Sequence, residues 1–246
     1  MMSIPQAQLI DGRKTFIPLE NNPEVLSRLC SNLGLEPGLT FHDVLSTSPE
    51  LLAWVPRPIH ALILLADSPI YFAARSAIIP TIPEYQGFGA HEPVIWMKQT
   101  IGHACGLMAL LHTVFNLDEN YLTPGSELDA LRQRAIELPP AGRADLLYTS
   151  AFLEKAHMDA AATGATTAPL PQDETHHHFV AFVKKDHKVW ELNGGMNGPL
   201  LRGTLEDEDL LSERGLAMTV QDYLDAAAQG GYGGMSIVAV AGKETQ

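Results

Sequence analysis

Apolar segments with strand character come from well-separated parts of this chain, with helical patterns between them. The expected strands are Ile59–Leu65, Phe179–Lys184, Lys188–Leu192 and Met235–Ala241. Apolar residues recur at helical spacing in Cys105–Asn116, Glu127–Glu137 and Pro140–Met158. Strands separated by helices must share one sheet to bury their apolar side chains, so the pattern predicts a single α/β layer domain.

Four further segments complete the prediction. A helix is expected at Pro23–Leu35, with Gly34 as its stop signal, and another at Leu216–Ala228. Ser68–Pro93 has several prolines and glycines and little hydrophobic periodicity, which predicts irregular structure. Asp159–Glu174 is rich in Ala, Thr, Gly and Pro, and is expected to be a mobile loop rather than a linker.

Length and composition restrict the class of protein. With 246 residues, 46% of them hydrophobic, the chain can bury one sizeable core, so we expect one domain over residues 1–246. Two cysteines, Cys30 and Cys105, argue against a disulfide framework and favour a reducing compartment. Cys30 belongs to an amphipathic pattern and is expected in the core. With no apparent signal peptide or membrane span, we expect a soluble monomer in the cytoplasm, with the nucleus as a second compartment.

Cys105 stands where the sequence predicts a helix to begin. It opens an apolar helical run that contains Leu107, Met108 and Leu111, and small and polar residues precede it. The helix dipole and the unpaired N–H groups of a first turn both favour a thiolate. Gln99 lies six residues upstream, close enough for its amide to reach the sulfur. A thiolate beside an amide donor is suited to acyl transfer through a tetrahedral oxyanion. A small apolar core residue is the alternative for Cys105.

A predicted β-hairpin supplies the partners of a cysteine nucleophile. His178 begins its first strand and Asn193 follows its second, so antiparallel pairing should place the two side chains close together. The chain order cysteine, histidine, then Asn or Asp is that of papain-like peptidases.

These residues lie within a longer series of ordered motifs. The motifs are Phe16-Ile-Pro-Leu-Glu, Leu33-Gly-Leu, Pro49-Glu-Leu-Leu-Ala-Trp-Val-Pro-Arg-Pro, Lys98-Gln-Thr-Ile-Gly-His-Ala-Cys-Gly, Glu154-Lys-Ala-His-Met-Asp, His178-Phe-Val-Ala-Phe-Val and Trp190-Glu-Leu-Asn-Gly. In this order they resemble the ubiquitin C-terminal hydrolases, a family of papain-like deubiquitinating cysteine peptidases, and most closely the small single-domain members. The resemblance implies a central antiparallel sheet flanked by helices, with a knotted backbone.

The same resemblance assigns roles to the candidate residues. It implies Cys105 as nucleophile, His178 as general base and acid, Gln99 as oxyanion stabiliser and Asn193 as the residue that orients the imidazole. It also implies a crossover loop at about residues 155–175, which arches over the site. Candidates for substrate binding come from the opening motif and the crossover: Ile17, Pro18, Leu19, Glu20, Asp159, Ala160, Thr166 and Ala168.

Charge narrows the choice of partners. The formal net charge of −13 argues against nucleic acid, whose phosphates require clustered Lys and Arg. The resemblance implies that ubiquitin or a ubiquitin-like protein binds through a tail that carries arginines, which an acidic surface would attract. Glu20, Asp159, Asp173 and Glu174 are candidates for this surface by position, with solvated surface residues as the alternative.

Two residues depart from the family pattern. Asn193 stands where the family has aspartate, and His103 stands where relatives usually carry Asn. An amide oxygen can orient an imidazole but carries no charge to stabilise imidazolium. A ubiquitin-binding module with impaired catalysis is therefore an alternative function. His103 could reproduce the hydrogen bonding of the usual Asn or be exposed on the turn.

Two other chemistries compete for the same residues. An unrelated Cys-His-Asn acyltransferase, of the transglutaminase or arylamine acetyltransferase type, would leave the N-terminal motifs unexplained. A zinc site formed by His176, His177, His178 and Cys105 is disfavoured, because consecutive strand residues face opposite ways. We therefore expect no metal and no other cofactor.

Overall fold

The computed structural model describes residues 6–35, 37–117, 119–167 and 169–242. Its central feature is a six-stranded sheet in the order β3-β8-β4-β5-β6-β7, in which all neighbouring strands are antiparallel. Its strands are β3 (Thr40–Asp43), β4 (Ile59–Asp67), β5 (His177–Lys185), β6 (Lys188–Leu192), β7 (Leu200–Thr204) and β8 (Met235–Ala241). A separate hairpin near the N-terminus pairs β1 (Gln8–Ile10) with β2 (Arg13–Thr15).

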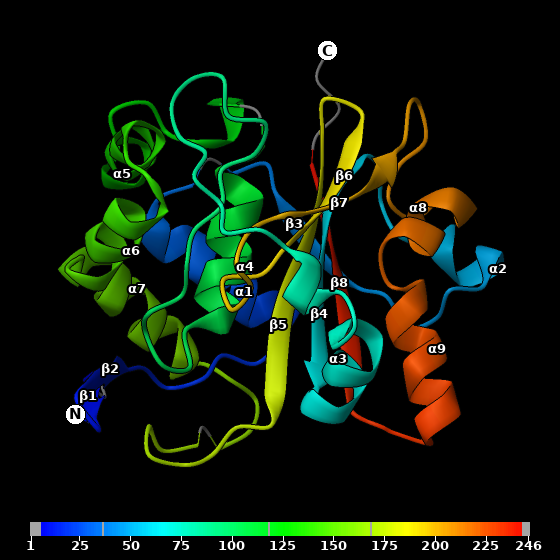
Figure 1. Cartoon of the computed structure of the whole chain (residues 1–246), viewed down its shortest axis with the longest axis horizontal. Helices are drawn as coiled ribbons and strands as arrows, with labels where there is room; N and C mark the ends of the chain where they lie inside the picture. Colours follow the sequence, from blue (N-terminus) through cyan, green and yellow to red (C-terminus); the bar gives the residue numbers. More distant parts are fainter. Residues whose placement is uncertain (1–5, 36, 118, 168, 243–246) are drawn as a thin grey trace.

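Helices cover both faces of the sheet (Figure 1). One face carries α1 (Pro23–Leu33), α4 (Cys105–Val114), α5 (Glu127–Glu137), α6 (Pro140–Tyr148) and α7 (Ala151–Ala161). The other face carries α2 (Pro49–Leu52), α3 (Ser68–Arg75), α8 (Glu213–Met218) and α9 (Gln221–Gly230). Two short 3-10 helices, Ile79–Thr81 and Glu119–Tyr121, lie in the connections.

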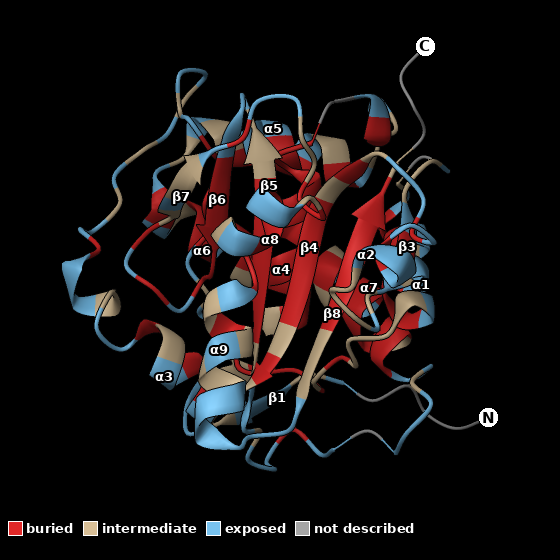
Figure 2. Ribbon diagram, turned by 90° about the vertical axis from the view of Figure 1, so that its right-hand side faces the viewer, coloured by how far each residue is buried: buried red, intermediate tan, exposed pale blue. Residues whose placement is uncertain are grey.

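The apolar strands follow from this double cover. In β4, Ala61 and Ile63 face one helical layer while Leu62 and Leu64 face the other, and all four are completely buried. A strand buried on both faces has no polar side to alternate with its apolar one, which explains the continuous apolar run. Figure 2 shows the burial extending along the central strands. The predicted α/β class with a central antiparallel sheet flanked by helices is confirmed.

Most predicted elements are confirmed, but two predicted helices are divided and one helix was missed. The loop expected at Asp159–Glu174 also begins later, because α7 continues to Ala161. The segment 140–158 is not one helix: α6 ends at Tyr148, and Ser150 caps α7 by accepting a hydrogen bond from Leu153 N–H at 3.2 Å. The segment 216–228 is interrupted at Thr219, whose hydroxyl donates to the Gly215 carbonyl at 2.8 Å. In both places a side-chain hydroxyl that bonds the backbone accompanies the break, although the apolar period continues.

The third error concerns residues 68–75, which form helix α3 instead of irregular structure. Pro69 occupies its first turn, where the missing N–H costs nothing. Its buried residues are Ile70, Tyr71 and Arg75. A charged residue on the buried side conceals the apolar period, and only the partners of Arg75 elsewhere in the chain make that burial possible.

No helix among the residues described here is long and apolar enough to cross a membrane. Cys30 has only 8% of its surface exposed and packs in the core between α1 and the sheet, as expected.

Candidate active site

The first residue of α4 is Cys105, and the helix packs against β5, which carries His178 as its second residue. The backbone N–H of Phe179 bonds to the Cys105 sulfur, so the sulfur lies beside the start of β5. The N-cap residue Ala104 has no side-chain oxygen to occupy the first-turn N–H groups. The start of α4 and the start of β5 therefore lie side by side, and they bring the Cys105 thiol close to the His178 imidazole.

A cleft of about 890 Å³ opens at this point, and Gln99, Cys105 and His178 are among the residues that line it. The other walls include Thr15 from the β1–β2 hairpin, Tyr71 from α3 and the loop residues 171–175. Three of the four catalytic candidates thus share one cavity. The fourth, Asn193, has 2% of its surface exposed, does not line the cleft and interacts with the imidazole of His178.

His112 in α4 and Asn116, two residues beyond the end of α4, hold the segment that carries Gln99. His112 Nε2 accepts a hydrogen bond from Met97 N–H at 3.0 Å, and one turn later Asn116 bonds both backbone groups of Ile95. Burial lowers the pKa of His112 to about 3, so the ring is neutral and its Nε2 can accept. The nucleophile and the oxyanion residue are therefore positioned by the same helix.

The Gln99 side chain is itself oriented. Its Nε2 donates to the Ile101 carbonyl at 3.0 Å, and an amide nitrogen has a second hydrogen to donate. Its backbone N–H donates to the Gly194 carbonyl at 2.9 Å. This bond joins the segment that carries Gln99 to Gly194, the residue immediately after Asn193.

Gly194 is required by this close approach. A methyl group on its α-carbon would lie 2.8 Å from Gln99 Cβ and 2.9 Å from Gln99 N. We expect Gly194→Ala to lower turnover by at least about tenfold and stability by about 1–3 kcal/mol, because the backbone must shift. Steady-state kinetics and thermal unfolding measure both effects.

The control for that variant is Gly233→Ala, since a methyl group there would meet nothing within 4 Å. It should leave both quantities unchanged. Equal effects from the two substitutions, or none from Gly194→Ala, would show that the contact between Gly194 and Gln99 is unimportant.

The electrostatics of the pair oppose a resting thiolate. Burial raises the pKa of the Cys105 thiol, although the N–H groups of Phe179, Gly106 and Cys105 itself act in the opposite direction. Burial also lowers the pKa of His178, while the contact with Asn193 and the charge of Glu191 partly offset this. The N–H groups at the helix start favour the thiolate, as expected, but desolvation by burial is the larger effect on the Cys105 pKa.

Asn193 holds its place through two hydrogen bonds. Its Oδ1 accepts from Gly195 N–H at 2.8 Å, and its Nδ2 donates to the Tyr71 hydroxyl at 2.8 Å. His178 Nε2 is buried without a hydrogen bond of regular geometry among the described residues. Asn193 nevertheless lies close enough to raise the pKa of His178. Tyr71 was not expected at the site, because its segment was assigned irregular structure.

His103 lies in the turn before Cys105 with φ of 54°, a left-handed conformation that is uncommon for a residue with a side chain. Its ring is half-buried, lines the cleft and bonds to the backbone of Phe16. Burial lowers its pKa, which that bond partly offsets. The alternative that His103 is simply exposed on the turn is therefore wrong.

The substrate-binding candidates that the structure describes are not among the residues that line the cleft. Ile17, Leu19 and Ala160 are buried in the core. Pro18 is half-buried, Ala168 lies outside the described residues, and a substrate contact at any of the eight candidates stays a prediction.

The acidic candidates have partners within the chain. The Glu20 carboxylate accepts from Ala165 N–H at 3.0 Å and Thr166 N–H at 2.7 Å, and also from the Thr166 hydroxyl. Burial acts to raise the pKa of Glu20, but these hydrogen bonds prevail and lower it. Asp159 forms an ion pair with Lys155 at 2.5 Å. Glu20 therefore anchors the crossover loop, a polar contact that the sequence analysis missed.

Asp173 and Glu174 are exposed and line the cleft. His176 and His177 are exposed as well, and His177 lies 3.0 Å from the Asp67 carboxylate. In the part of the chain that the structure describes, no group of three or more His, Cys, Asp or Glu side chains could hold a metal ion.

A thiol at a helix start, an imidazole on the adjoining strand and an amide donor in one cleft are the components of a papain-like cysteine hydrolase.

Residues 16–225 match a family model described as ubiquitin carboxyl-terminal hydrolase, family 1. A ubiquitin carboxyl-terminal hydrolase of Aplysia californica is 35% identical over 204 residues, which cover 82% of this chain and 92% of the relative.

Ubiquitin carboxyl-terminal hydrolase YUH1 of Saccharomyces cerevisiae is 32% identical over 222 residues, which cover 87% of this chain and 90% of the relative. Among solved structures, the catalytic domain of Trichinella spiralis UCH37 bound to ubiquitin vinyl methyl ester superposes with a TM-score of 0.66 at 20% identity. That comparison covers 93% of this chain and 96% of the other. The chain belongs to the ubiquitin carboxyl-terminal hydrolase family, whose members are cysteine peptidases that act as deubiquitinases.

Proposed function

We propose that residues 1–246 form one catalytic domain that hydrolyses amides, esters and thioesters at the C-terminal glycine of ubiquitin, with Cys105 as the nucleophile. The observation that carries this proposal is the meeting of Gln99, Cys105 and His178 in one cleft, with Asn193 interacting with the imidazole. Ubiquitin is chosen as partner because the relatives are named for its C-terminus, and a ubiquitin-like protein remains a second substrate to test.

The geometry suggests the order of events. His178 takes the Cys105 proton as the sulfur attacks the glycine carbonyl carbon, and the oxyanion accepts hydrogen bonds from Gln99 Nε2 and the α4 N-terminus. His178 then gives its proton to the leaving group as the carbonyl–leaving-group bond breaks, which leaves a thioester. Water attacks the thioester carbon, His178 takes a proton from that water, and the thiolate departs and is reprotonated.

Ubiquitin with an electrophile in place of its C-terminal carboxylate provides the direct test. Covalent capture at Cys105, located by peptide mass analysis, supports the hydrolase. Binding without capture would indicate a module with impaired catalysis, and the absence of binding would indicate an unrelated acyltransferase. Since the thiol, imidazole and amide donor share the cleft, we expect capture.

Asn193→Asp tests the uncharged third residue. We expect higher turnover and a wider active pH range, because the carboxylate raises the His178 pKa and lowers that of Cys105. In the wild type, burial lowers the pKa of His178. In Asn193→Asp the carboxylate opposes this effect. The limb of the pH profile that reports loss of the imidazolium proton should therefore move to higher pH, and the limb that reports thiolate formation should move to lower pH. Gly195 N–H, which donates to Asn193 Oδ1 in the wild type, is placed to donate to the carboxylate as well.

The measurement is kcat/KM against pH for the wild type and Asn193→Asp. Asp173→Asn, which removes a charge from the exposed cleft wall, is the control for a general electrostatic effect. Superimposable wild-type and Asn193→Asp profiles would show that the amide already meets the needs of the site.

The crossover at about residues 155–175 is proposed to select the leaving group. Residues 171–175, at its far end, line the cleft beside Cys105, and its middle is held by Glu20 through Ala165 and Thr166 (yellow-green segment at the base of β5 in Figure 1). Such a loop admits an extended peptide but not a folded domain. We expect efficient release of small adducts and short peptides, and poor cleavage between two folded ubiquitins.

Lengthening the crossover tests this selection. Several Gly-Ser residues inserted after Thr167, beyond the contacts with Glu20, should increase diubiquitin cleavage at least about tenfold, because a longer loop costs little stability. Small-adduct turnover should stay unchanged. A matched insertion in the exposed 232–233 turn is the control. The selection is contradicted if the native chain cleaves diubiquitin efficiently or if the crossover insertion has no effect.

We further propose the cytoplasm as the site of action, with the nucleus as a second compartment. The proposed nucleophile is a free thiol, which a reducing compartment preserves.

A further inference from the structure

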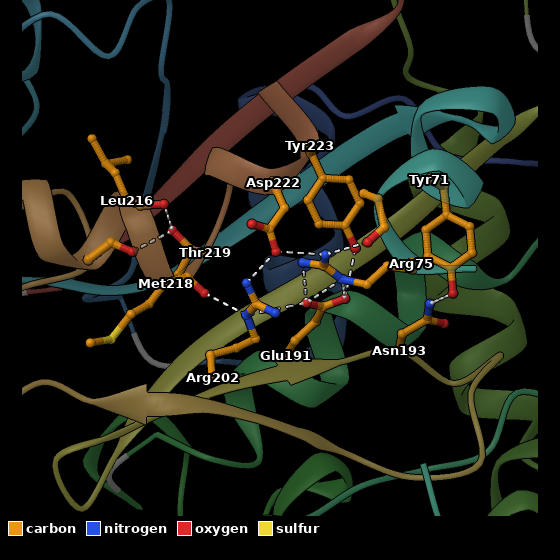
Figure 3. A network of polar contacts seen from close by, with 12 residues as sticks. Tyr71, Arg75, Glu191, Asn193, Arg202, Leu216, Met218, Thr219, Asp222 and Tyr223 are labelled. Atoms are coloured by element: carbon orange, nitrogen blue, oxygen red, sulfur yellow. Dashed lines mark hydrogen bonds and ion pairs between the residues drawn. The ribbon is translucent and has the colours of Figure 1, made fainter. Parts of the chain in front are cut away.

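The side chain of Asn193 is bound on both of its ends. Gly195 N–H can only donate, so the atom that it contacts at 2.8 Å must be the amide oxygen. The nitrogen is then left on the other side, where it donates to the Tyr71 hydroxyl at 2.8 Å (Figure 3). Tyr71 thus provides the acceptor that a buried amide nitrogen requires.

The orientation matters for the imidazole. A methyl group on Gly195 would lie 3.2 Å from Asn193 Oδ1 and 3.9 Å from His178 Nε2, so oxygen and ring flank the same point. An oxygen in this position stabilises imidazolium, and the contact indeed raises the pKa of His178. An –NH₂ group in the same position would repel imidazolium. The side chain therefore assists catalysis in one of its two orientations.

Tyr71 is a rigid acceptor. It is 7% exposed, and its ring packs against His178 with centroids 4.6 Å apart and against Tyr223 at 6.5 Å. Burial, with the charge of Glu191, raises the pKa of Tyr71 to about 12, so its hydroxyl stays neutral at working pH.

A buried ion pair fixes α3, the helix that carries Tyr71, to β6, the strand that precedes Asn193. Arg75 on α3 bonds Glu191 on β6 at 2.8 Å, and both side chains are fully buried. Tyr223 on α9 donates to the same carboxylate at 2.7 Å (Figure 3). Glu191 stands two residues before Asn193, and the two residues bond Arg75 and Tyr71 of the same helix, α3. The distance between Tyr71 and Asn193 is thus set by two anchored elements.

We infer that Tyr71 is a positioning residue, whose hydroxyl holds the Asn193 amide with its oxygen toward His178. The inference rests on the proposed function, in which Asn193 orients the imidazole. A carboxylate at position 193 has two accepting oxygens and no nitrogen that needs an acceptor. Tyr71 should therefore matter for an Asn at this position and much less for an Asp.

The test is a double-mutant cycle of Tyr71→Phe and Asn193→Asp, assayed with a fluorogenic amide of the ubiquitin C-terminus. In the wild-type background, Tyr71→Phe should lower kcat about tenfold at unchanged KM, the scale of one lost buried hydrogen bond. The imidazolium limb of its pH profile should move to lower pH, because the displaced oxygen stabilises the ring less. In the Asn193→Asp background the same substitution should change kcat by less than about threefold and leave that limb in place.

Tyr223→Phe is the matched control, because it removes a hydroxyl of the same buried cluster that bonds Glu191 and not Asn193. Its kcat should stay within about threefold of the wild type, since no bond to Asn193 is lost. Thermal unfolding of both Phe variants compares their stability. NMR titration of His178 in inactive Cys105→Ala protein gives a second measurement, in which Tyr71→Phe should lower the pKa only where Asn193 is retained.

Three results would overturn the inference: an unchanged kcat in Tyr71→Phe, an equal loss in both backgrounds, or an equal loss in Tyr223→Phe. Failure of the proposed function is recognised separately, since wild-type protein would then neither turn over the amide nor be captured by the electrophile.

Discussion

Cys105→Ala is expected to abolish hydrolysis of ubiquitin C-terminal adducts, with a loss of at least about 10⁴-fold in kcat, while ubiquitin affinity stays nearly unchanged. The substitution removes the proposed nucleophile but little contact surface, because Cys105 is only partly exposed among the residues that line the cleft. Single-turnover kinetics and calorimetric titration with ubiquitin measure the two quantities. Wild-type-like turnover would rule out the assignment.

Cys30→Ala is the matched control for that experiment. It removes the other thiol of the chain from the core between α1 and the sheet, and burial keeps the pKa of that thiol far above its usual range. We expect full turnover from the folded variant, with a stability loss of about 1 kcal/mol from the vacated core space. Loss of turnover in folded Cys30→Ala protein would mean that activity depends on packing rather than on the Cys105 sulfur.

Gln99→Ala should have the next largest effect, a decrease in kcat of about 10²–10³-fold, as expected for the loss of one oxyanion donor. The Gln99 amide donates to the Ile101 carbonyl with one hydrogen and has another for the developing charge. The expected pattern is a low kcat with an unchanged KM, because the interaction forms in the transition state. Electrophile capture should be slowed by a similar factor.

Lys98→Ala controls for disturbance of the segment, since Lys98 is the exposed neighbour of Gln99. Activity close to wild type is expected. If Gln99→Ala instead raised KM at constant kcat, its side chain would be a substrate contact and not an oxyanion donor.

The sequence by itself determined most of the layer architecture. Glu127–Glu137, Lys188–Leu192 and Met235–Ala241 form elements with the predicted bounds, because apolar periodicity and local stop signals are properties of neighbouring residues. The thiol and the imidazole were predicted for the same reason. Cys105 stands at a recognisable helix start, and one hairpin brings His178 and Asn193 together.

Local reasoning failed where hydrogen bonding competes with the apolar period. The predicted helices are divided at Ser150 and Thr219, where side-chain hydroxyls form hydrogen bonds with the backbone. The spacing of apolar residues does not reveal such hydrogen bonds. The signal for Ser150 was present in the sequence, because Ser is a preferred N-cap residue, but the apolar residues on both sides obscured it.

Only the tertiary structure decided how the site is supported. Arg75 on the buried side of α3 has no local explanation, and its partner Glu191 lies 116 residues further along the chain. The hydrogen bond between Tyr71 and Asn193 spans 122 residues. A buried charge or amide is stable only when a complementary group is placed against it, and that placement depends on how α3, β6 and α9 pack together. The sequence therefore names the reacting groups, whereas packing between distant segments determines their orientation.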